Sequence, residues 1–488
     1  MITTSESTAQ RAAPPVPPLA RVPVGAVAVV VALYHLVVGS LERGHFFDEA
    51  LMLAIGRHHL DWGSADQPPV APLLAGLLDA IAPGVNPVLH AVPALLTAAA
   101  VVVAALIARE MGGDARAQTM TALAQATGLW TVFVGHWVTP YSLEPIQWLL
   151  IVWLLVRWIR VRDDRLLLVV GVVLGIATQT KFQVVGLGVA LVVALLAVGP
   201  RELLRRPAFW VAALLGALIA APTLVWQAVH GWPQVQMGAI AASEASLFGG
   251  PGPNAAAMLL LAGLLGVVLI VAGFVGAVRD PRLRPYRFLA VAFVLLWIVF
   301  AVLVGRAYYL VGMHGAAAAL GAVWLQHRRE AGHRRLRWTV WPGAILSVLL
   351  AGLVHTGSSG FTSSAEQIQD KVATTVAQVY RALPPGQQAH TVIYGSSYIW
   401  SAFVDGADPG LGLPQAHGGN RSYGYFDPPP DDHDTVIQVG GGPTLLAPLG
   451  ITMRPAADLG DGNTVWVGTG TTRPWSQVWP QLRTLEVQ

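Results

Sequence analysis

Two adjacent carboxylates, Asp48 and Glu49, are the residues best suited to chemistry, because they follow the first long apolar run of the chain. Acidic groups at the edge of a bilayer are costly to desolvate and mark functional sites. On a helix that begins here, the two side chains point about 100° apart, so only one can face a given pocket while the other caps or pairs. The alternative is that both favour the positive end of the helix dipole.

A second polar motif lies in Trp62–Pro69, where Gly63 and the Pro68–Pro69 pair force a turn. It contains Asp66 and Gln67. Asp66 either belongs to the same site as the first carboxylates or caps the helix that follows.

Residues 50–60, between these motifs, predict an amphipathic helix with Arg57 and His58 off its apolar side. Such a helix is suited to lying in the membrane interface. With carboxylates at both ends, it would form the rim of a site that accepts a lipid.

Further charged residues stand out because their surroundings are apolar. Lys181 lies between two apolar runs, Arg306 precedes Ala307-Tyr308-Tyr309-Leu310, and Glu144 begins another run. Single cations at this depth can snorkel to the interface, but a phosphate group would also bind such partners. Together with Arg43 and the carboxylates above, they suit a site that combines an anionic leaving group with a base.

Metal ligation is not indicated by the spacing of the histidines. The outer loops contain His45, His58, His59, His136 and His230 without the i, i+4 histidine pair of a zinc helix. We expect these histidines to be interfacial or structural. The absence of cysteine excludes disulfides and thiolate metal sites.

The elements that must position these residues are membrane helices. Of 488 residues, 54% are hydrophobic and only 12% are charged, which excludes an ordinary soluble protein. A helix of about 20 apolar residues crosses a bilayer. Eleven apolar runs predict membrane spans at residues 23–41, 88–108, 117–135, 145–159, 166–180, 183–199, 208–228, 255–278, 286–304, 311–326 and 338–355. The first reads as an uncleaved helix rather than a signal peptide.

Basic residues predict the orientation of these spans, because cytoplasmic loops are enriched in Lys and Arg. Alternate loops place 20 basic residues on one side and only Arg43, Arg57, Lys181 and Arg306 on the other. We therefore expect a cytoplasmic N-terminal tail (1–22), a transmembrane domain (23–355) with a catalytic outer loop (42–87), and an extracytoplasmic C-terminal domain (356–488).

The C-terminal domain is predicted to have a different composition and fold. Hydropathy falls at Gly357, where a Gly/Ser-rich linker is expected to lead into a helix from Ser364 to Leu383. Short β-rich runs at 391–394, 435–439 and 464–467 alternate with Gly, Pro and Asp turns. These predict a small α/β domain over the outer face, with a role in either covering the site or selecting the acceptor.

These motifs resemble the polytopic glycosyltransferases of the C superfamily, specifically bacterial family 39 proteins similar to protein O-mannosyltransferases and aminoarabinose transferases. The resemblance rests on Phe47-Asp48-Glu49, on Gly56-Arg57-His58-His59-Leu60-Asp61-Trp62-Gly63, and on Asp66-Gln67-Pro68-Pro69. Supporting matches are Glu144, Thr180-Lys181-Phe182, Arg306 to Leu310, and the tail segments Gly419-Asn420, Tyr423 to Pro430 and Val436 to Gly440. It extends over nearly the whole chain.

Two departures from the family pattern are visible. Ala50-Leu51-Met52 follows the acidic pair where the family often has Leu-Tyr-Phe, which should alter packing more than chemistry. The tail has Gly419-Asn420 without the histidine of the family, which puts an acceptor-specific role of the tail in doubt.

The resemblance implies a membrane glycosyltransferase that takes a sugar from a polyprenyl-phosphate donor in an inverting displacement. Asp48 would be the base, Lys181 with Arg306, Tyr308 and Tyr309 would bind the donor phosphate, and Glu49, Asp66 and Glu144 would orient the acceptor or hold a divalent ion. Arg43, Arg57 and Gln67 are first-loop candidates. The acceptor is a glycan, lipid or protein, and no nucleic-acid partner is expected.

Two other classes of protein share some of these features. A flippase or transporter of lipid-linked intermediates would also have many spans, but it would keep its charges near the bilayer midplane in two related halves. A non-catalytic assembly factor would not need Asp48.

Overall fold

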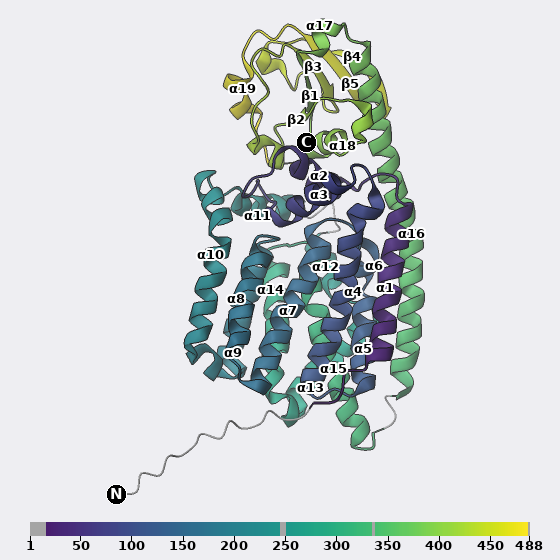
Figure 1. The fold of residues 1–488 in the computed structure, drawn as a ribbon, viewed down its shortest axis with the longest axis vertical. Coiled ribbons are helices and arrows are strands. Elements are labelled where there is room, and N and C mark those ends of the chain that lie inside the picture. The colour runs from purple at the N-terminus through teal and green to yellow at the C-terminus, as the bar shows by residue number, and fades with distance from the viewer. Residues whose placement is uncertain (1–15, 245–249, 334–336, 487–488) are drawn as a thin grey trace, which may run out of the picture.

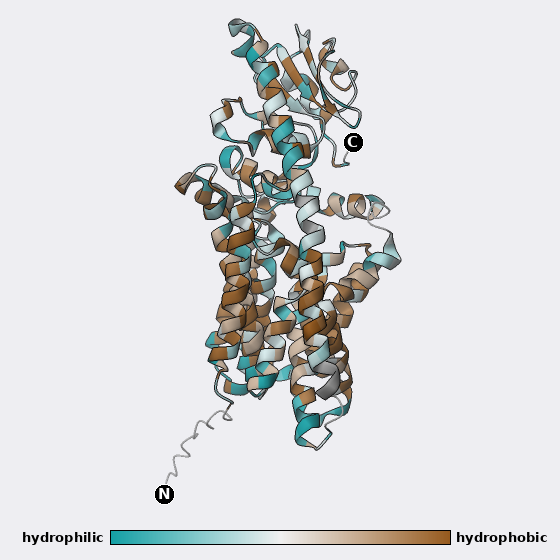
Figure 2. Cartoon of the chain, turned by 90° about the vertical axis from the view of Figure 1, so that its right-hand side faces the viewer, coloured by the Kyte–Doolittle hydropathy of each residue, from teal (hydrophilic) through white to brown (hydrophobic). Residues whose placement is uncertain are grey.

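The computed structural model describes residues 16–244, 250–333 and 337–486. Most of the predicted N-terminal tail, including Arg11, lies outside the described residues, as do Arg334 and Arg335 of a predicted cytoplasmic loop. The described chain forms a bundle of apolar helices with a smaller domain at one end (Figures 1 and 2).

The helical domain extends from the first helix to the fifteenth. It contains α1 (Arg21–Leu41), α2 (Phe47–His58), α3 (Val70–Ile81), α4 (Asn86–Glu110), α5 (Ala115–Ala126), α6 (Leu129–Val134), α7 (Pro140–Val161), α8 (Arg165–Thr178), α9 (Gln183–Val198), α10 (Pro207–Val229), α11 (Pro233–Ser243), α12 (Pro251–Leu260), α13 (Gly263–Arg279), α14 (Arg287–Val302) and α15 (Val311–Glu330). Short 3-10 turns lie at Arg201–Arg205, Pro281–Tyr286 and Ala307–Leu310.

All eleven predicted apolar runs lie largely within helices. In the described chain, six helices are long and apolar enough to cross a membrane, and the number is seven if the bent pair α12–α13 forms one span. Helices α8 and α9 are apolar but shorter, with 14 and 16 residues. The length and composition of these helices are those of a multi-pass membrane protein.

Two of the predicted spans are broken, and the breaks meet. The run 117–135 divides into α5 and α6 at Gly128, and the run 255–278 bends by 89° between α12 and α13. The Leu129 amide donates a hydrogen bond to the Leu261 carbonyl at 2.8 Å, so backbone groups freed by one break pair with those freed by the other. Gly263 has φ +72° against the Thr127 carbonyl, where a side chain would be strained.

Helix α16 (Arg337–Ala382) joins the two domains, and the predicted Gly/Ser linker after Gly357 is wrong. The helix has 46 residues and continues past the predicted boundary at 355. Hydroxyl groups that would favour a linker instead donate to carbonyls of the preceding helical turn, as Ser363 does to Ser359 and Ser364 to Gly360.

The C-terminal domain contains a five-stranded sheet of order β2-β1-β3-β5-β4. Its strands are β1 (Thr391–Gly395), β2 (Ala416–His417), β3 (Thr435–Val439), β4 (Arg454–Gly460) and β5 (Asn463–Thr469). Strands β1, β2 and β3 are parallel, and β4 and β5 form an antiparallel hairpin that extends the sheet from β3. The three predicted strands are confirmed. Strands β2 and β4 were not predicted, because one has two residues and the other begins Arg-Pro-Ala-Ala.

Helices cover both faces of this sheet. Ile393 and Ile437 pack with α16 and with α18 (Tyr398–Asp405). Val392 and Val436 face the other side and pack with α19 (Trp475–Leu482). The described chain also has the short helix α17 (Pro385–Gln388) and 3-10 turns at Pro409–Leu411, Arg421–Tyr425 and Ala447–Leu449.

One hydrophobic core connects α2 and α3 to the C-terminal domain. All six residues from Ala50 to Ile55 are buried, and α2 packs against α3 on one side and α18 on another. The apolar side of this helix therefore contacts protein, whereas its sequence predicts an apolar side in the membrane interface. Its apolar side chains pack against protein, because the sheet domain covers them.

Candidate active site

A cavity of about 630 Å³ lies where the helical domain meets the C-terminal domain. Seven of the predicted site residues line it, namely Asp48, Asp66, Gln67, Lys181, Arg306, Tyr308 and Tyr309. These residues come from segments between positions 48 and 309, so the fold brings together residues that lie far apart in the sequence. Aromatic side chains, including Phe46, Trp130 and Trp137, make up much of the wall.

Asp48 is the second residue of α2 and points into this cavity. Its Oδ2 accepts a hydrogen bond from the Tyr141 hydroxyl at 2.6 Å, and its Oδ1 accepts one from the Tyr398 hydroxyl at 3.2 Å. Burial raises the pKa of Asp48 above its ordinary value, against the opposing effects of Tyr141 and of the charges on Arg421 and Lys181. A carboxylate with a raised pKa is a stronger proton acceptor than an ordinary solvated one.

The turn before α3 brings Asp66 next to Lys181. The Lys181 ammonium donates to the Asp66 backbone carbonyl at 3.3 Å. The Asp66 carboxylate accepts from Ser422 of the C-terminal domain at 3.2 Å and from Gln67 at 3.1 Å. The N-cap position of α3 is Pro69, without a side-chain capping bond, so Asp66 does not cap this helix.

An ion-pair network of Glu244, Arg306 and Arg421 also lines the cavity. Glu244 accepts from Arg306 at 2.7 Å and from Arg421 at 2.8 and 3.0 Å. The Arg421 guanidinium also lies 4.9 Å from the Tyr398 ring centre. Burial lowers the pKa of Arg421, but nearby Tyr398, Asp66 and Glu244 raise it above its ordinary value, so this side chain stays cationic.

Tyrosines connect this network to Asp48. Tyr308 stacks on Trp130 with ring centres 4.6 Å apart and lies 4.5 Å from Tyr141. Tyr309 packs edge-on against Tyr308 at 5.2 Å. Burial first, and then the charge of Asp48, raise the pKa of Tyr398 well above its ordinary value, so this hydroxyl remains a hydrogen-bond donor.

Four predicted site residues do not line the cavity: Glu49, Glu144, Arg43 and Arg57. Arg43 is exposed. Arg57 forms a bidentate ion pair with Asp79, both contacts at 2.8 Å, and donates to the carbonyls of Asp405 and Ala407. It therefore ties α2 and α3 to the C-terminal domain, at a distance from the residues that line the cavity.

The three carboxylates expected to orient the acceptor or to hold a divalent ion are not brought together. Among the described residues, Glu49, Asp66 and Glu144 do not form a group with converging ligand atoms. Glu49 points away from the cavity toward His45 and His90. Glu144 is buried in α7, within electrostatic range of Lys181.

Several residues of this site were missed in the sequence. Tyr141, Glu244, Tyr398 and Arg421 all line the cavity. Tyr141 lies three residues before the predicted site residue Glu144, in the segment that leads into the same helix. The sequence carries no signal that brings Tyr398 and Arg421 to Asp48, because they lie some 350 residues away in another domain.

The geometry unites a half-buried carboxylate, three cations and an aromatic wall around one cavity. The cations are Lys181, Arg306 and Arg421. Such an arrangement can accept a proton at Asp48 while stabilising negative charge on another group several ångströms away. The aromatic wall can pack against an apolar or carbohydrate ligand.

The chain is similar to known proteins both in part of its sequence and in its fold. Residues 66–226 match the family model of dolichyl-phosphate-mannose-protein mannosyltransferase, a stretch that includes Asp66, Glu144 and Lys181. No curated protein matches the sequence at a significant level. Among solved structures, ArnT from Cupriavidus metallidurans bound to undecaprenyl phosphate is 16% identical, with a TM-score of 0.59 over 92% of this chain and 98% of that chain. The apo state of the same protein is 14% identical, with a TM-score of 0.60 over the same shares. The predicted resemblance to polytopic glycosyltransferases of the C superfamily is confirmed, in sequence over residues 66–226 and in fold over nearly the whole chain.

Proposed function

We propose that the protein is an integral-membrane glycosyltransferase that moves a sugar from a polyprenyl-phosphate donor to an acceptor. The observation that carries this proposal is the half-buried Asp48 in a cavity that Lys181, Arg306 and Arg421 also line. A sugar transferase with a phosphate leaving group needs both a base and a cationic clamp. That the structurally similar ArnT binds undecaprenyl phosphate supports a lipid-linked donor here.

Asp48 acts as the base in this proposal. It accepts the proton of the acceptor hydroxyl as that oxygen attacks the anomeric carbon. The bond between the anomeric carbon and the phosphate oxygen breaks on the opposite face, so the configuration inverts and polyprenyl phosphate leaves. Tyr141 holds the carboxylate in position through its 2.6 Å hydrogen bond.

The cations neutralise the charge that develops on the leaving phosphate. Lys181 contributes one charge from the turn after α8, and Arg306 and Arg421 contribute two more from other segments that line the cavity. Tyr308 and Tyr309 supply hydroxyls and ring faces beside them. Buried Glu144 is assigned as an electrostatic partner of Lys181, and Asp66 is assigned to acceptor orientation.

The C-terminal domain contributes to the site as well as covering it. Tyr398, Ile399 and Arg421 come from this domain and line the cavity. We assign the acceptor to this side, because Tyr398 contacts the Asp48 oxygen that the acceptor hydroxyl would approach. On the positive-inside rule, the same end of the molecule faces the outside of the cell, with the N-terminus in the cytoplasm.

The test is transfer by purified full-length protein. Polyprenyl-phosphate hexoses and pentoses are incubated with cell-envelope acceptors, and wild type is compared with Asp48→Asn. We expect at least about a 100-fold loss of rate in the variant, the range reported for a missing general base. Asp370→Asn, an exposed carboxylate on α16, is the matched control and should retain full rate.

Equal transfer by wild type and Asp48→Asn would refute the base assignment. Translocation of lipid-linked sugars in vesicles, without transfer from any donor, would identify a flippase instead.

A further inference from the structure

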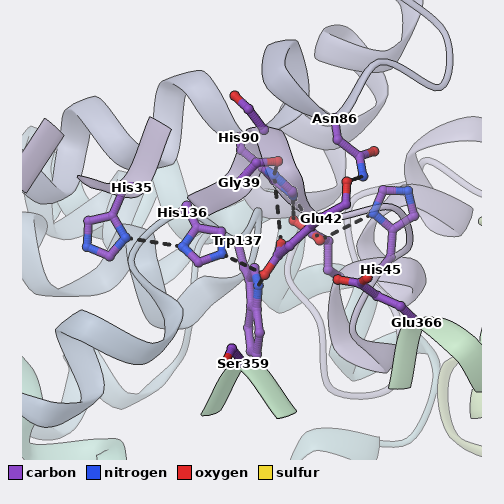
Figure 3. A network of polar contacts seen from close by, with 12 residues as sticks. His35, Gly39, Glu42, His45, Asn86, His90, His136, Trp137, Ser359 and Glu366 are labelled. Carbon is purple, nitrogen blue, oxygen red and sulfur yellow. Dashed lines mark hydrogen bonds and ion pairs between the residues drawn. The ribbon is translucent and has the colours of Figure 1, made fainter. Parts of the chain in front are cut away.

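Glu49 lies next to Asp48 in α2 but points into a separate buried polar cluster. Figure 3 shows His45 and His90 converging there at the outer end of α1, with Glu42 and His136 nearby. Glu49 is 0% exposed, His90 1% and His45 7%. The proposed transfer reaction does not use any of these three groups.

Three ligand atoms converge in this cluster. His45 Nδ1 lies 3.3 Å from the Glu49 carboxylate and His90 Nε2 lies 3.1 Å from it. All three atoms lie within 4.8 Å of one another. Zinc binds imidazole nitrogen and carboxylate oxygen at about 2.0–2.2 Å, so ligand atoms around a tetrahedral zinc ion are separated by about 3.3 Å. Two of the three separations have this value.

The orientation of His90 is that of a metal ligand. Its Nδ1 lies 2.8 Å from the Gly39 carbonyl oxygen. A carbonyl can only accept, so Nδ1 carries a proton, which leaves Nε2, directed at Glu49, as the ring nitrogen that can bind a metal ion. A backbone carbonyl that fixes the tautomer in this way is the usual outer-shell partner of a metal-bound histidine.

The absence of a side chain at Gly39 makes room for the His90 imidazole. A Cβ on Gly39 would lie 2.7 Å from His90 Nδ1 and 2.8 Å from its Cβ. Any other residue at position 39 would displace the imidazole. The Val138 amide, at 2.8 Å, fixes the other side of the Glu49 carboxylate.

Charge also favours a cation here. Glu49 and Glu42 are two carboxylates in a largely buried space, and the groups facing them are the imidazoles of His45, His90 and His136. An uncompensated buried carboxylate is costly. A divalent ion bound by two neutral imidazoles and one carboxylate compensates that charge and suits the N₂O ligand set that zinc prefers.

We propose that His45, Glu49 and His90 form a zinc-binding site, with water as the fourth ligand. The site joins the end of α1, α2 and α4, and Gln369 of α16 accepts from the His45 amide at 2.6 Å. The ion therefore fixes the start of α2, the turn that carries Asp48. Its role is to hold this turn, and it takes no part in the transfer step.

The test measures zinc in untagged full-length protein purified in detergent, by elemental analysis. Wild type should contain roughly one zinc ion per chain, since three protein ligands and water complete a tetrahedral site. His45→Gln and His90→Gln should each weaken zinc binding by at least about 100-fold. His35→Gln removes a buried histidine outside the triad, and His390→Gln removes one from an exposed His/Asp group, so both controls should keep their zinc.

A second measurement covers variants that fail to fold. Wild type is treated with a chelator, and Zn²⁺ is added back during thermal unfolding. Chelation should lower the Tm, and Zn²⁺ should restore it.

Zinc-free wild type whose Tm does not respond to Zn²⁺ would overturn the proposal, and so would variants His45→Gln and His90→Gln that retain the ion. Because neither measurement depends on sugar transfer, failure of the zinc site is distinguishable from failure of the proposed function.

Discussion

At the scale of single residues, the neighbours Asp48 and Glu49 belong to different surroundings. The helix turns Asp48 into the cavity and Glu49 into the histidine cluster, as adjacent side chains on a helix require. The acidic pair is therefore two sites rather than one. Their hydrogen-bond partners distinguish them, since Asp48 accepts from a tyrosine hydroxyl and Glu49 contacts an imidazole.

Lys181 should act on donor binding more than on the chemical step. Replacing it with Gln removes a charge-assisted contact of about 1.5–3 kcal/mol, which corresponds to a rise in the donor KM of roughly 10- to 100-fold. Steady-state kinetics with varied donor give the measurement. Lys371→Gln alters the other lysine of the chain, in the C-terminal half of α16, and should leave KM unchanged. An unchanged KM in Lys181→Gln would remove it from the phosphate site.

Asp405 should make the stability of the C-terminal domain depend on pH. Burial raises its pKa from 3.8 to about 7, against hydrogen bonds from the Ala416 amide and the Tyr423 hydroxyl. Between these values the unfolded chain has lost the proton while the folded domain keeps it, so stability falls as pH rises from about 4 to about 7. The loss is at most about 4 kcal/mol.

The Tm measured from pH 4 to pH 8 should therefore decline less in Asp405→Asn than in wild type. Asp370→Asn serves as the exposed control. Parallel pH profiles in wild type and Asp405→Asn would show that Asp405 does not titrate differently in the folded protein.

At the scale of elements, α2 and α3 cross where two glycines meet. A Cβ on Gly56 would overlap the Pro72 carbonyl oxygen and lie 2.6 Å from the Gly76 amide nitrogen. The crossing lies near the end of α2 that is far from Asp48, and it fixes this helix against α3, which follows the turn that contains Asp66.

Gly56→Ala should separate these helices. Overpacking of this kind costs about 1–3 kcal/mol, which corresponds to a Tm lower by several degrees. Thermal unfolding in detergent measures the change, and transfer activity should fall with it. Gly352→Ala places a methyl group in open space on α16 and should leave both unchanged. Equal Tm values for wild type and Gly56→Ala would contradict the crossing described above.

At the scale of the whole molecule, the two domains line one cavity. Tyr398 and Arg421 reach the cavity from the C-terminal domain, while α16 joins the domains without a flexible linker. Arg57, which is paired with Asp79, stabilises the contact by donating a hydrogen bond to the Asp405 carbonyl at the end of α18. The domain is consequently a fixed wall of the site.

Arg57→Ala should weaken the contact between α2 and the C-terminal domain. It leaves Asp79 half-buried and unpaired, at a cost of roughly 3 kcal/mol. Hydrogen exchange should accelerate in α2 and α18 while the transmembrane helices keep their protection. Arg454→Ala, on the exposed edge strand β4, is the control. Unchanged exchange in α18 would indicate that the hydrophobic core alone holds the domain.

Sequence alone determined the membrane class, the positions of the apolar helices, the three central strands and most of the cavity-lining polar residues. The helices and strands depend on local composition and periodicity. The polar residues of the cavity could be found because charges in apolar surroundings are conspicuous. Only the tertiary structure decided which carboxylate faces the cavity, that Arg57 fastens two domains, and that Tyr398 and Arg421 complete the site. Those outcomes depend on contacts between distant segments. The same is true of the histidine cluster, where His90 lies 41 residues from Glu49 and no ligand spacing marks it.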